Sequence, residues 1–595
     1  MANLTDDKRI KVEKVSFSYS SEDDTAAKPP KKALDGISLQ IGKGSYTAIT
    51  GPNGSGKSTL AKLIDILEMP DEGRIVVFGK DTSSEDSFWD VRRKCSIIFQ
   101  NPDNQIVGTT VEEDVAFGPE NLGVPTAELR ERVDKALKDV GLYEYRTRPS
   151  SALSGGQKQK LAIAGALAMH PDILIMDEST AMLDPHSRQE VLEIVEAMRI
   201  RDELTLITIT HDMTEAARCD RILVIKDGRV ALEGTPSEVF SQKELIEEMS
   251  LVLPVEYSFA YKIAEMSKGT LSAEDLKGRD SLKLACAREL KKIKADMVPG
   301  TKRKERKAQD EVIMSVKDLS YSYDEGKTYA IEDIDLDVHK GEILVLAGRS
   351  GCGKTTLITH FNGILKAQKG SVTVNGIDTS DKKNVMKIRQ KVGLVFQYPE
   401  YQLFDETVYK DICFGLKRWS VPEKEFPDRV DKACKMTGFK TEYLEKSPFD
   451  LSGGQQRRAA IAGVLVMEPD ILVMDEPGAG LDPTGRKSMF DMISRLRDSG
   501  VTVIIVSHNM DDSAIVADRV CYMRRGRIVK VGRPEEMFCG KENEFNIPRP
   551  YITEFALEVA DLAGIPGYDS CGDFTPEGEA LALAAYYAGG DHHDR

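Results

Sequence analysis

The chain has little of what marks secreted or membrane-spanning proteins. Its nine cysteines are scattered and form no C-x-x-C pair, which excludes a disulfide framework and a cysteine zinc site of ordinary spacing. No apolar run approaches the roughly 18 residues of a membrane helix. The N-terminus, "MANLTDDKRIKVEKV", has no apolar signal core. We therefore expect a cytoplasmic location.

An excess of positive charge is also missing. The formal net charge of −16 argues against a broad nucleic-acid surface, so we expect no nucleic-acid partner. With 41% hydrophobic and 30% charged residues the composition is that of a globular protein. A length of 595 residues exceeds what one hydrophobic core usually organises, and several domains are expected.

Two glycine-rich segments are present instead, "GPNGSGKSTL" at 51–60 and "GRSGCGKTTL" at 348–357. Both fit G-x-x-x-x-G-K-[ST], in which backbone N–H groups surround phosphates, the lysine reaches the terminal phosphates and the hydroxyl binds Mg²⁺. Each follows a short apolar run and precedes a helical pattern, a context that disfavours a glycine turn without nucleotide. The predicted nucleotide-binding residues here are Gly51, Asn53, Gly54, Ser55, Gly56, Lys57, Ser58, Thr59, Gly348, Ser350, Gly351, Cys352, Gly353, Lys354, Thr355 and Thr356.

The similarity between the two regions extends far beyond this loop. Lys57 and Lys354 lie 297 residues apart, and Ser154 and Ser452 lie 298 apart. "FQNPDNQ" and "FQYPEYQ", like "ILIMDE" and "ILVMDE", recur at the same offsets. The chain is therefore predicted to be a tandem duplication of one α/β domain with a parallel sheet.

Paired carboxylates follow an apolar run in each half. Asp177 and Asp475 end these runs and are predicted to hold the metal, while Glu178 and Glu476 would orient or deprotonate the attacking water. The alternative is that each carboxyl pair merely caps a following helix. The full set of predicted Mg²⁺ ligands is Ser58, Gln100, Asp177, Thr355, Gln397 and Asp475.

Two further residue pairs recur in register. His211 and His508 follow apolar runs, and we interpret them as hydrogen-bonding the γ-phosphate region, although a lone histidine is by default a satisfied core residue. Tyr19 and Tyr323 precede the cradles and are either core aromatics or platforms for adenine.

The segments "LSGGQKQK" and "LSGGQQRR" can each open a helix whose N-terminal N–H groups form a second anion site. The predicted phosphate contacts of these segments are Ser154, Gly155, Gly156, Gln157, Ser452, Gly453, Gly454 and Gln455.

With LSGGQ in place, the pattern resembles the ATPase domain of ABC transporters, over about 10–240 and 312–540. The resemblance implies an α/β fold of two tandem P-loop ATPase domains. Each would have a RecA-like core, an antiparallel β subdomain and a helical subdomain, and would use ATP and Mg²⁺. In that family LSGGQ completes the nucleotide site of the opposing domain, so the two halves are expected to pair within one chain.

On this basis we divide the chain into four parts. Residues 1–240 are the first ATPase domain, and 241–311 are its C-terminal extension plus a linker that contains the charged run "TKRKERK" at 301–307. Residues 312–540 are the second ATPase domain, and 541–595 are a further C-terminal extension.

The glutamine-bearing segments "FQNPDNQIVGTTVEEDVAFGPENLGVP" and "FQYPEYQLFDETVYKDICFGLKRWSVP" resemble those of energy-coupling-factor (ECF) transporter ATPases. These bacterial importers take up vitamins or transition-metal ions. The resemblance implies a membrane T-component and a substrate-binding S-component as partners, with the chain at the cytoplasmic face of the membrane. Fusion of the two ATPases into one chain departs from the usual family arrangement.

A second class stays open at this point. Twin-ATPase chains without membrane spans include ABC-type translation factors that act on ribosomes, and DNA-repair ATPases. Translation factors join their halves by a basic helical linker, whereas 241–311 holds 15 Lys and Arg against 13 Asp and Glu. That balance weakens the ribosome hypothesis, because ribosome binding needs strong phosphate neutralisation.

Overall fold

A computed structural model describes the chain over residues 8–19, 32–181, 183–298, 310–324, 326–381, 383–540, 545–565, 567–569 and 572–589. The charged run 301–307 lies outside the described residues. Contacts divide the chain into two compact units, each described here by itself. Unit 1 comprises Met1–Tyr257 and Leu271–Leu282, and unit 2 comprises Ser258–Thr270 and Lys283–Arg595.

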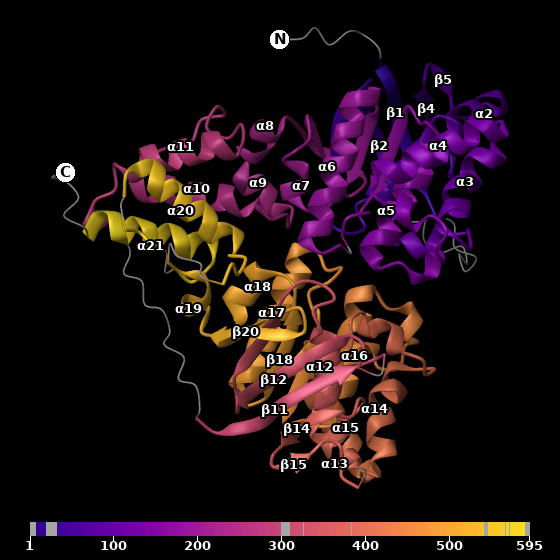
Figure 1. Cartoon of the computed structure of the whole chain (residues 1–595). Coiled ribbons are helices and arrows are strands. Elements are labelled where there is room, and N and C mark those ends of the chain that lie inside the picture. Colours follow the sequence, from indigo (N-terminus) through magenta and orange to yellow (C-terminus); the bar gives the residue numbers. More distant parts are fainter. Residues whose placement is uncertain are drawn as a thin grey trace. The chain divides into compact units, whose positions relative to one another are not determined.

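Unit 1 contains two sheets (Figure 1). The first is antiparallel, in the order β2-β1-β4-β5, and the second has six strands in the order β10-β9-β3-β8-β7-β6. The strands are β1 (Lys8–Ser18), β2 (Lys32–Gly42), β3 (Tyr46–Thr50), β4 (Glu72–Val77), β5 (Lys80–Asp81), β6 (Cys95–Ile98), β7 (Ile173–Asp177), β8 (Thr205–Ile209), β9 (Arg221–Lys226) and β10 (Arg229–Gly234).

The central strands of the larger sheet are parallel and buried along their whole length, as the continuous apolar runs "YTAIT", "ILIMD" and "TLITI" require. Only the β9–β10 hairpin is antiparallel among the pairings described in this sheet. The parallel register aligns the carboxyl ends of β3, β7 and β8, which brings the segments that follow them to one edge.

The helices of the first repeat are α1 (Lys57–Ile64), α2 (Glu85–Arg92), α3 (Val111–Asn121), α4 (Thr126–Asp139), α5 (Gly155–Ala168), α6 (Pro185–Asp202), α7 (Met213–Ala216), α8 (Pro236–Phe240) and α9 (Lys243–Glu248). Short 3₁₀ turns are η1 (Pro102–Asn104), η2 (Tyr143–Tyr145) and η3 (Ser150–Ala152). Helices α3, α4 and α5 pack on one another and form the helical part.

Unit 2 repeats this plan, with sheets in the orders β12-β11-β14-β15 and β16-β17-β18-β13-β19-β20. Its strands are β11 (Val312–Ser322), β12 (Tyr329–His339), β13 (Ile343–Ala347), β14 (Lys369–Val374), β15 (Ile377–Asp378), β16 (Val392–Val395), β17 (Ile471–Asp475), β18 (Thr502–Ser507), β19 (Arg519–Arg524) and β20 (Arg527–Gly532). A buried core joins both sheets to helix α12.

The helices of the second repeat are α12 (Lys354–Phe361), α13 (Val385–Lys391), α14 (Val408–Arg418), α15 (Phe426–Thr437), α16 (Gly453–Leu465), α17 (Pro483–Asp498), α18 (Met510–Val516) and α19 (Pro534–Phe538). The 3₁₀ turns are η5 (Pro399–Gln402), η6 (Glu423–Glu425), η7 (Thr441–Tyr443) and η8 (Pro448–Asp450). Helices α14, α15 and α16 gather beside the strands as a separate helical part (Figure 1). The predicted architecture, two tandem α/β domains that each have a largely parallel sheet, an antiparallel sheet and a helical part, is confirmed.

The remaining helices are α10 (Val255–Ser267), α11 (Arg279–Leu290), η4 (Ala295–Met297), α20 (Tyr551–Ala563) and α21 (Pro576–Gly589). Within unit 2 the ring of Phe259 meets the ring of Phe555 edge-on at 5.5 Å, and Lys283 forms an ion pair with Glu558 at 3.2 Å. The extension that follows the first ATPase domain thus packs with the C-terminal helices of the second (Figure 1).

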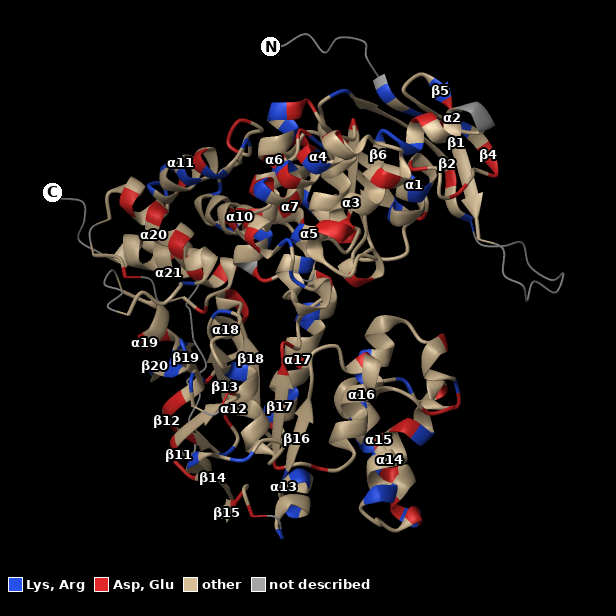
Figure 2. Ribbon diagram, turned by 45° about the vertical axis from the view of Figure 1, so that its right-hand side comes forward, with Lys and Arg blue, Asp and Glu red and all other residues tan. Residues whose placement is uncertain are grey.

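Charge is mixed rather than segregated. Figure 2 shows Lys and Arg interspersed with Asp and Glu over the described residues of both units. Among these residues, no helix is both long enough and apolar enough to cross a membrane.

Candidate nucleotide sites

The first cradle is a tight loop between β3 and α1. Gly51 has φ +147°, and a Cβ there would lie 2.0 Å from the Ile225 carbonyl oxygen. Gly56 has φ +101° at the N-cap of α1, and a Cβ there would lie 2.4 Å from the Ala33 carbonyl oxygen. Only glycine fits these two positions, which explains their place in the motif.

Lys57 begins α1 and is only 5% exposed. Its ammonium donates to the carbonyl oxygens of Gly51 at 2.9 Å and Pro52 at 3.0 Å, so the side chain folds back along the loop. A buried ammonium folded back over a glycine-rich loop is suited to binding phosphate oxygens.

The second cradle reproduces this geometry. Lys354 donates to Gly348 at 2.6 Å and to Arg349 at 3.0 Å, and Gly353 caps α12 with φ +102°. Cys352 occupies the position of Ser55, with its Sγ 4.0 Å from the Lys354 ammonium. Burial raises the pKa of the Cys352 thiol.

Oxygen donors for a cation meet beside each cradle. The Ser58 hydroxyl donates to Asp177 at 3.0 Å, and the Thr355 hydroxyl donates to Asp475 at 3.3 Å. Burial raises the pKa of Asp177, and it raises that of Asp475 to about 6, with the neighbouring Glu476 adding to the shift. Hydroxyl and carboxylate oxygens fit Mg²⁺, which keeps its remaining positions for water and phosphate.

The glutamates after β7 and β17 have strained backbones. Glu178 has φ +48° and Glu476 has φ +49°, the left-handed region that costs a non-glycine residue about 1–2 kcal/mol. His211 Nδ1 lies 3.4 Å from Glu178 Oε1, and His508 Nδ1 lies 2.7 Å from Glu476 Oε1. The structure therefore brings each predicted histidine to its predicted glutamate.

The first glutamate has a further partner. Gln100 Nε2 donates to Glu178 Oε2 at 3.2 Å, so the predicted metal ligand Gln100 contacts the glutamate in this structure. Burial acts to raise the pKa of Glu178, but the hydrogen bond and charge of His211 outweigh it, and the pKa is lowered. In the second half, Gln397 is exposed.

An aromatic side chain stands beside each cradle. The Tyr19 hydroxyl is 3.2 Å from the Thr59 hydroxyl, and the Tyr323 hydroxyl is 3.2 Å from that of Thr356. Tyr19 is 48% exposed and Tyr323 is 67% exposed, which excludes the alternative of core aromatics.

In unit 1 the cradle shares one cavity of about 370 Å³ with Tyr19, Gln100, Asp177 and Glu178, and His211 is not among the lining residues. Sequence reasoning missed Lys32 and Ala33, which approach from β2 and carry no motif. The Ser154–Gln157 segment does not line this cavity. The lining residues are Tyr19, Lys32, Ala33, Asn53, Gly54, Ser55, Gly56, Lys57, Ser58, Thr59, Gln100, Asp177 and Glu178.

Each LSGGQ segment opens a long helix with an exposed N-terminus. Ser154 caps α5, and Ser452 caps α16, each in a reciprocal capping box with the glutamine three residues later. Both serines are exposed. The first N–H groups of α5 and α16 are therefore available to an anion.

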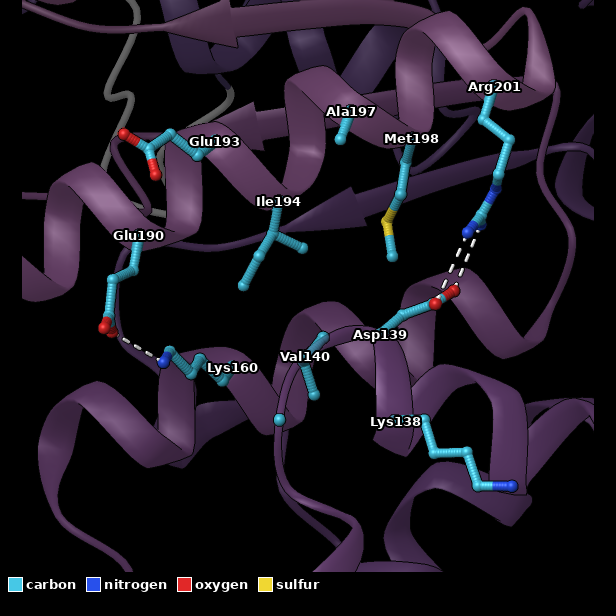
Figure 3. A pocket seen from close by; sticks show the side chains of 11 residues that line it. Lys138, Asp139, Val140, Lys160, Glu190, Glu193, Ile194, Ala197, Met198 and Arg201 are labelled. Atoms are coloured by element: carbon cyan, nitrogen blue, oxygen red, sulfur yellow. Dashed lines mark hydrogen bonds and ion pairs between the residues drawn. The ribbon is translucent and has the colours of Figure 1, made fainter.

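A second cavity of about 520 Å³ lies between the helical part and helix α6 of unit 1 (Figure 3). Two ion pairs span it: Lys160 with Glu190 at 2.8 Å, and Arg201 with Asp139 at 3.1 Å. It contains none of the predicted site residues.

The fold and the two phosphate cradles define a tandem P-loop ATPase. The family model for "ABC transporter" matches residues 34–181 and 331–479. A protein of Caldanaerobacter subterraneus, provisionally named an ABC transporter ATP-binding protein, is 36% identical over 562 residues, which is 92% of this chain and 96% of that protein. The chain belongs to the ABC transporter ATP-binding family. It is an ATPase that binds ATP with Mg²⁺.

Two further similarities cover one half each. The energy-coupling factor transporter ATP-binding protein EcfA1 of Symbiobacterium thermophilum is 51% identical over 245 residues, covering 41% of this chain and 85% of that protein. The structure of CbiO1 from Clostridium perfringens, described as part of the ABC transporter complex CbiONQ, is 40% identical. It covers 42% of this chain and 96% of that chain, with a TM-score of 0.37.

Proposed function

We propose that the chain is the energy-coupling subunit of a bacterial ECF-type importer, which uses ATP hydrolysis to drive uptake of a vitamin or a transition-metal ion. Its partners would be a membrane T-component and a substrate-binding S-component, and its place the cytoplasmic face of the membrane. The 51% identity to an energy-coupling factor ATPase supports this, together with the glutamine segments of both halves.

The observation that carries the proposal is an exposed aromatic surface beside the second glutamine segment. We call it the η5 surface; Tyr401 is 74% exposed, Phe404 60% and Phe414 52%. The rings of Phe404 and Phe414 meet edge-on at 5.1 Å. Clustered exposed aromatics mark a protein contact, here a helix of the T-component.

The chemistry needs charge neutralisation, a metal and an oriented water. Lys57 and Lys354 would neutralise the terminal phosphates, while the Ser58–Asp177 and Thr355–Asp475 pairs would hold Mg²⁺. When bound, Mg²⁺ neutralises charge that develops on the phosphoryl oxygens.

Glu178 and Glu476 position the attacking water and accept its proton. His211 and His508 contact these carboxylates through Nδ1. Their imidazoles would also hydrogen-bond the γ-phosphate region. The left-handed backbone at each glutamate fixes the carboxylate relative to the strand end.

We further propose that each site is completed within one chain. Lys57 would work with Ser452, and Lys354 with Ser154, because an exposed helix N-terminus can supply N–H groups to the open side of the γ-phosphate. Tyr19 and Tyr323 would stack on adenine.

The importer hypothesis is tested by recovering the tagged chain from native membranes in mild detergent. We expect polytopic membrane proteins to co-purify, and Tyr401→Ser with Phe404→Ser to reduce their recovery at least fivefold. The control is Tyr329→Ser on β12, an aromatic that is 48% exposed but far along the chain from η5. Recovery of ribosomes without membrane proteins would contradict the importer proposal and support the translation-factor class.

A further inference from the structure

Arg457 on α16 is a buried arginine that joins three segments of unit 2. It is 4% exposed. Its Nε and one terminal nitrogen donate to both oxygens of Glu400 in η5, at 3.1 Å and 2.9 Å. The other terminal nitrogen donates to the carbonyl oxygens of Ala479 at 2.7 Å and Pro477 at 3.4 Å. All three guanidinium nitrogens are thus engaged.

The two carbonyl groups belong to the turn that begins at Glu476. The Ala479 N–H donates to the Glu476 carbonyl at 3.0 Å, which closes the turn, and Arg457 binds the opposite side of the same peptide segment. Because Glu476 is held at φ +49°, its backbone depends on such neighbours to keep it there. Arg457 therefore acts on the position of Glu476 without touching it.

At its other end, Arg457 reaches the η5 surface. Glu400 is the immediate neighbour of Tyr401 in η5, and the Tyr398 ring lies 5.8 Å from the guanidinium. A bidentate arginine–carboxylate pair fixes orientation as well as distance. A displacement of η5 would accordingly be transmitted through one rigid side chain to the turn after Glu476.

The first half lacks this connection. At the matching position stands Gln159, which is 1% exposed and whose Nε2 has no hydrogen-bond partner among the described residues. The acidic residue of its glutamine segment, Asp103, pairs instead with Lys158 at 2.6 Å and is 61% exposed. A buried arginine–glutamate pair adds little net stability, so stability alone does not account for its presence in one half only.

We propose that Arg457 is a positioning residue of the second ATP site, and that it couples the η5 surface to Glu476 in that half alone. The inference rests on the proposed role of Glu476 in hydrolysis. It predicts that the two ATP sites respond differently to a partner bound at their glutamine segments.

The test replaces Arg457 by the residue of the first half, Arg457→Gln, in the full chain. We expect the turnover number to fall two- to tenfold. The loss is about twofold if the two ATP sites hydrolyse independently, and larger if hydrolysis at one site depends on the other. The KM for ATP should change less than twofold. The matched control is Arg458→Gln. Arg458 is the next residue of α16 and donates to Ser488 and Gly438 instead of the turn. It should keep turnover within 1.5-fold.

A second variant separates positioning from folding. Glu400→Gln keeps the carbonyl bonds of Arg457 but removes the ion pair, so we expect a smaller loss of turnover, and Arg457→Gln with Glu400→Gln should be no worse than Arg457→Gln alone. Binding of a fluorescent ATP analogue and the thermal midpoint report on folding. If the Arg457→Gln chain does not fold, the Glu400→Gln chain tests the inference. A loss of turnover at unchanged ATP affinity would support it, and wild-type turnover would contradict it.

Two results would overturn the inference: wild-type turnover in a folded Arg457→Gln chain, or a raised KM with unchanged turnover. Glu476→Gln is measured in the same series. Wild-type turnover in Glu476→Gln would contradict the proposed role of Glu476 in hydrolysis. If Glu476→Gln loses turnover but Arg457→Gln keeps it, only the positioning role of Arg457 is contradicted.

Discussion

Glu178 and Glu476 share a left-handed backbone and a histidine partner, although nearly three hundred residues separate them. A left-handed backbone also recurs at other matched positions, such as Asp227 and Arg525, so the repeated histidine contact is what distinguishes these two glutamates. At the scale of single residues, this is the strongest indication of where the chemistry occurs.

Replacing both glutamates, Glu178→Gln with Glu476→Gln, should reduce ATP turnover by about 10²–10⁴-fold because the acceptor for the water's proton is lost. ATP binding should persist, since the cradles are untouched. Phosphate release measures the rate. The control is Glu193→Gln, which changes a residue that lines the cavity of Figure 3. Wild-type turnover in the double variant would contradict the assignment.

The metal requirement of the second site should depend on pH through Asp475, whose pKa burial raises to about 6. Only the carboxylate form binds a cation, so the affinity for Mn²⁺ with a non-hydrolysable ATP analogue should fall as pH drops from 7 to 5.5. Electron paramagnetic resonance of Mn²⁺ measures this. Asp475→Asn should make the Mn²⁺ affinity of the second site less dependent on pH. A pH profile equal to that of the wild-type chain would contradict the role of Asp475.

Local motifs made most of the site predictable. The glycines, Lys57 and Asp177 each follow from chemistry that a few consecutive residues must perform. Lys32 and Arg457 could not be found in this way, because their roles arise from contacts with segments distant in the sequence.

At the scale of elements, the two repeats differ in how the helical part meets the core. In unit 1 the Lys160–Glu190 and Arg201–Asp139 pairs connect α5 and α4 to α6 across the cavity of Figure 3. In unit 2 the corresponding residues are Arg458 with Ser488, joined by a hydrogen bond, and Met436 with Ser499. Exposed ion pairs are weak, about 0–1 kcal/mol each, so they bias the position of the helical part without locking it.

Removing both cations, with Lys160→Gln and Arg201→Gln, should raise amide hydrogen exchange in α3–α5 and leave α14–α16 unchanged. Mass spectrometry resolves the two regions. Lys138→Gln is the control, since this lysine lines the same cavity but lies over the Tyr143 ring at 4.8 Å. The account of the ion pairs would be contradicted if amide exchange rose equally in α3–α5 and α14–α16, or if it did not rise in α3–α5.

Strands and helices were predictable to different degrees. Fully buried runs such as "ILIMD" identify the parallel strands, and LSGGQ identifies the start of α5. The short turn η5 (Pro399–Gln402) carries no periodicity, and its importance depends on a contact with α16 that no local pattern encodes.

The whole molecule is organised by its extensions as well as by its repeats. Phe259 of α10 and Lys283 of α11 contact α20 inside the unit that holds the second repeat. From the sequence, 241–311 is expected to be the C-terminal extension of the first half plus a linker. Where the helices of this segment pack could not be predicted, because packing between distant helices leaves no trace in local composition.

Two binding modules joined by a short flexible linker have an effective concentration of roughly millimolar for each other. Because the two halves belong to one chain, we expect pairing within a chain to exceed pairing between chains. The pairing can be tested with cysteines on a cradle and on the opposite LSGGQ segment. Ser55 is only 4% exposed, whereas Asn53 in the same loop is exposed, so Asn53→Cys is combined with Ser452→Cys.

The decisive measurement is oxidation of this double-cysteine chain, with Cys352→Ser and with both glutamates changed to Gln so that bound ATP persists. Denaturing gels separate crosslinks within one chain from those between chains. Paired sites predict a crosslink inside single chains that MgATP promotes at least fivefold over the nucleotide-free protein. A crosslink formed only between chains, or one that MgATP does not change, would contradict the central claim.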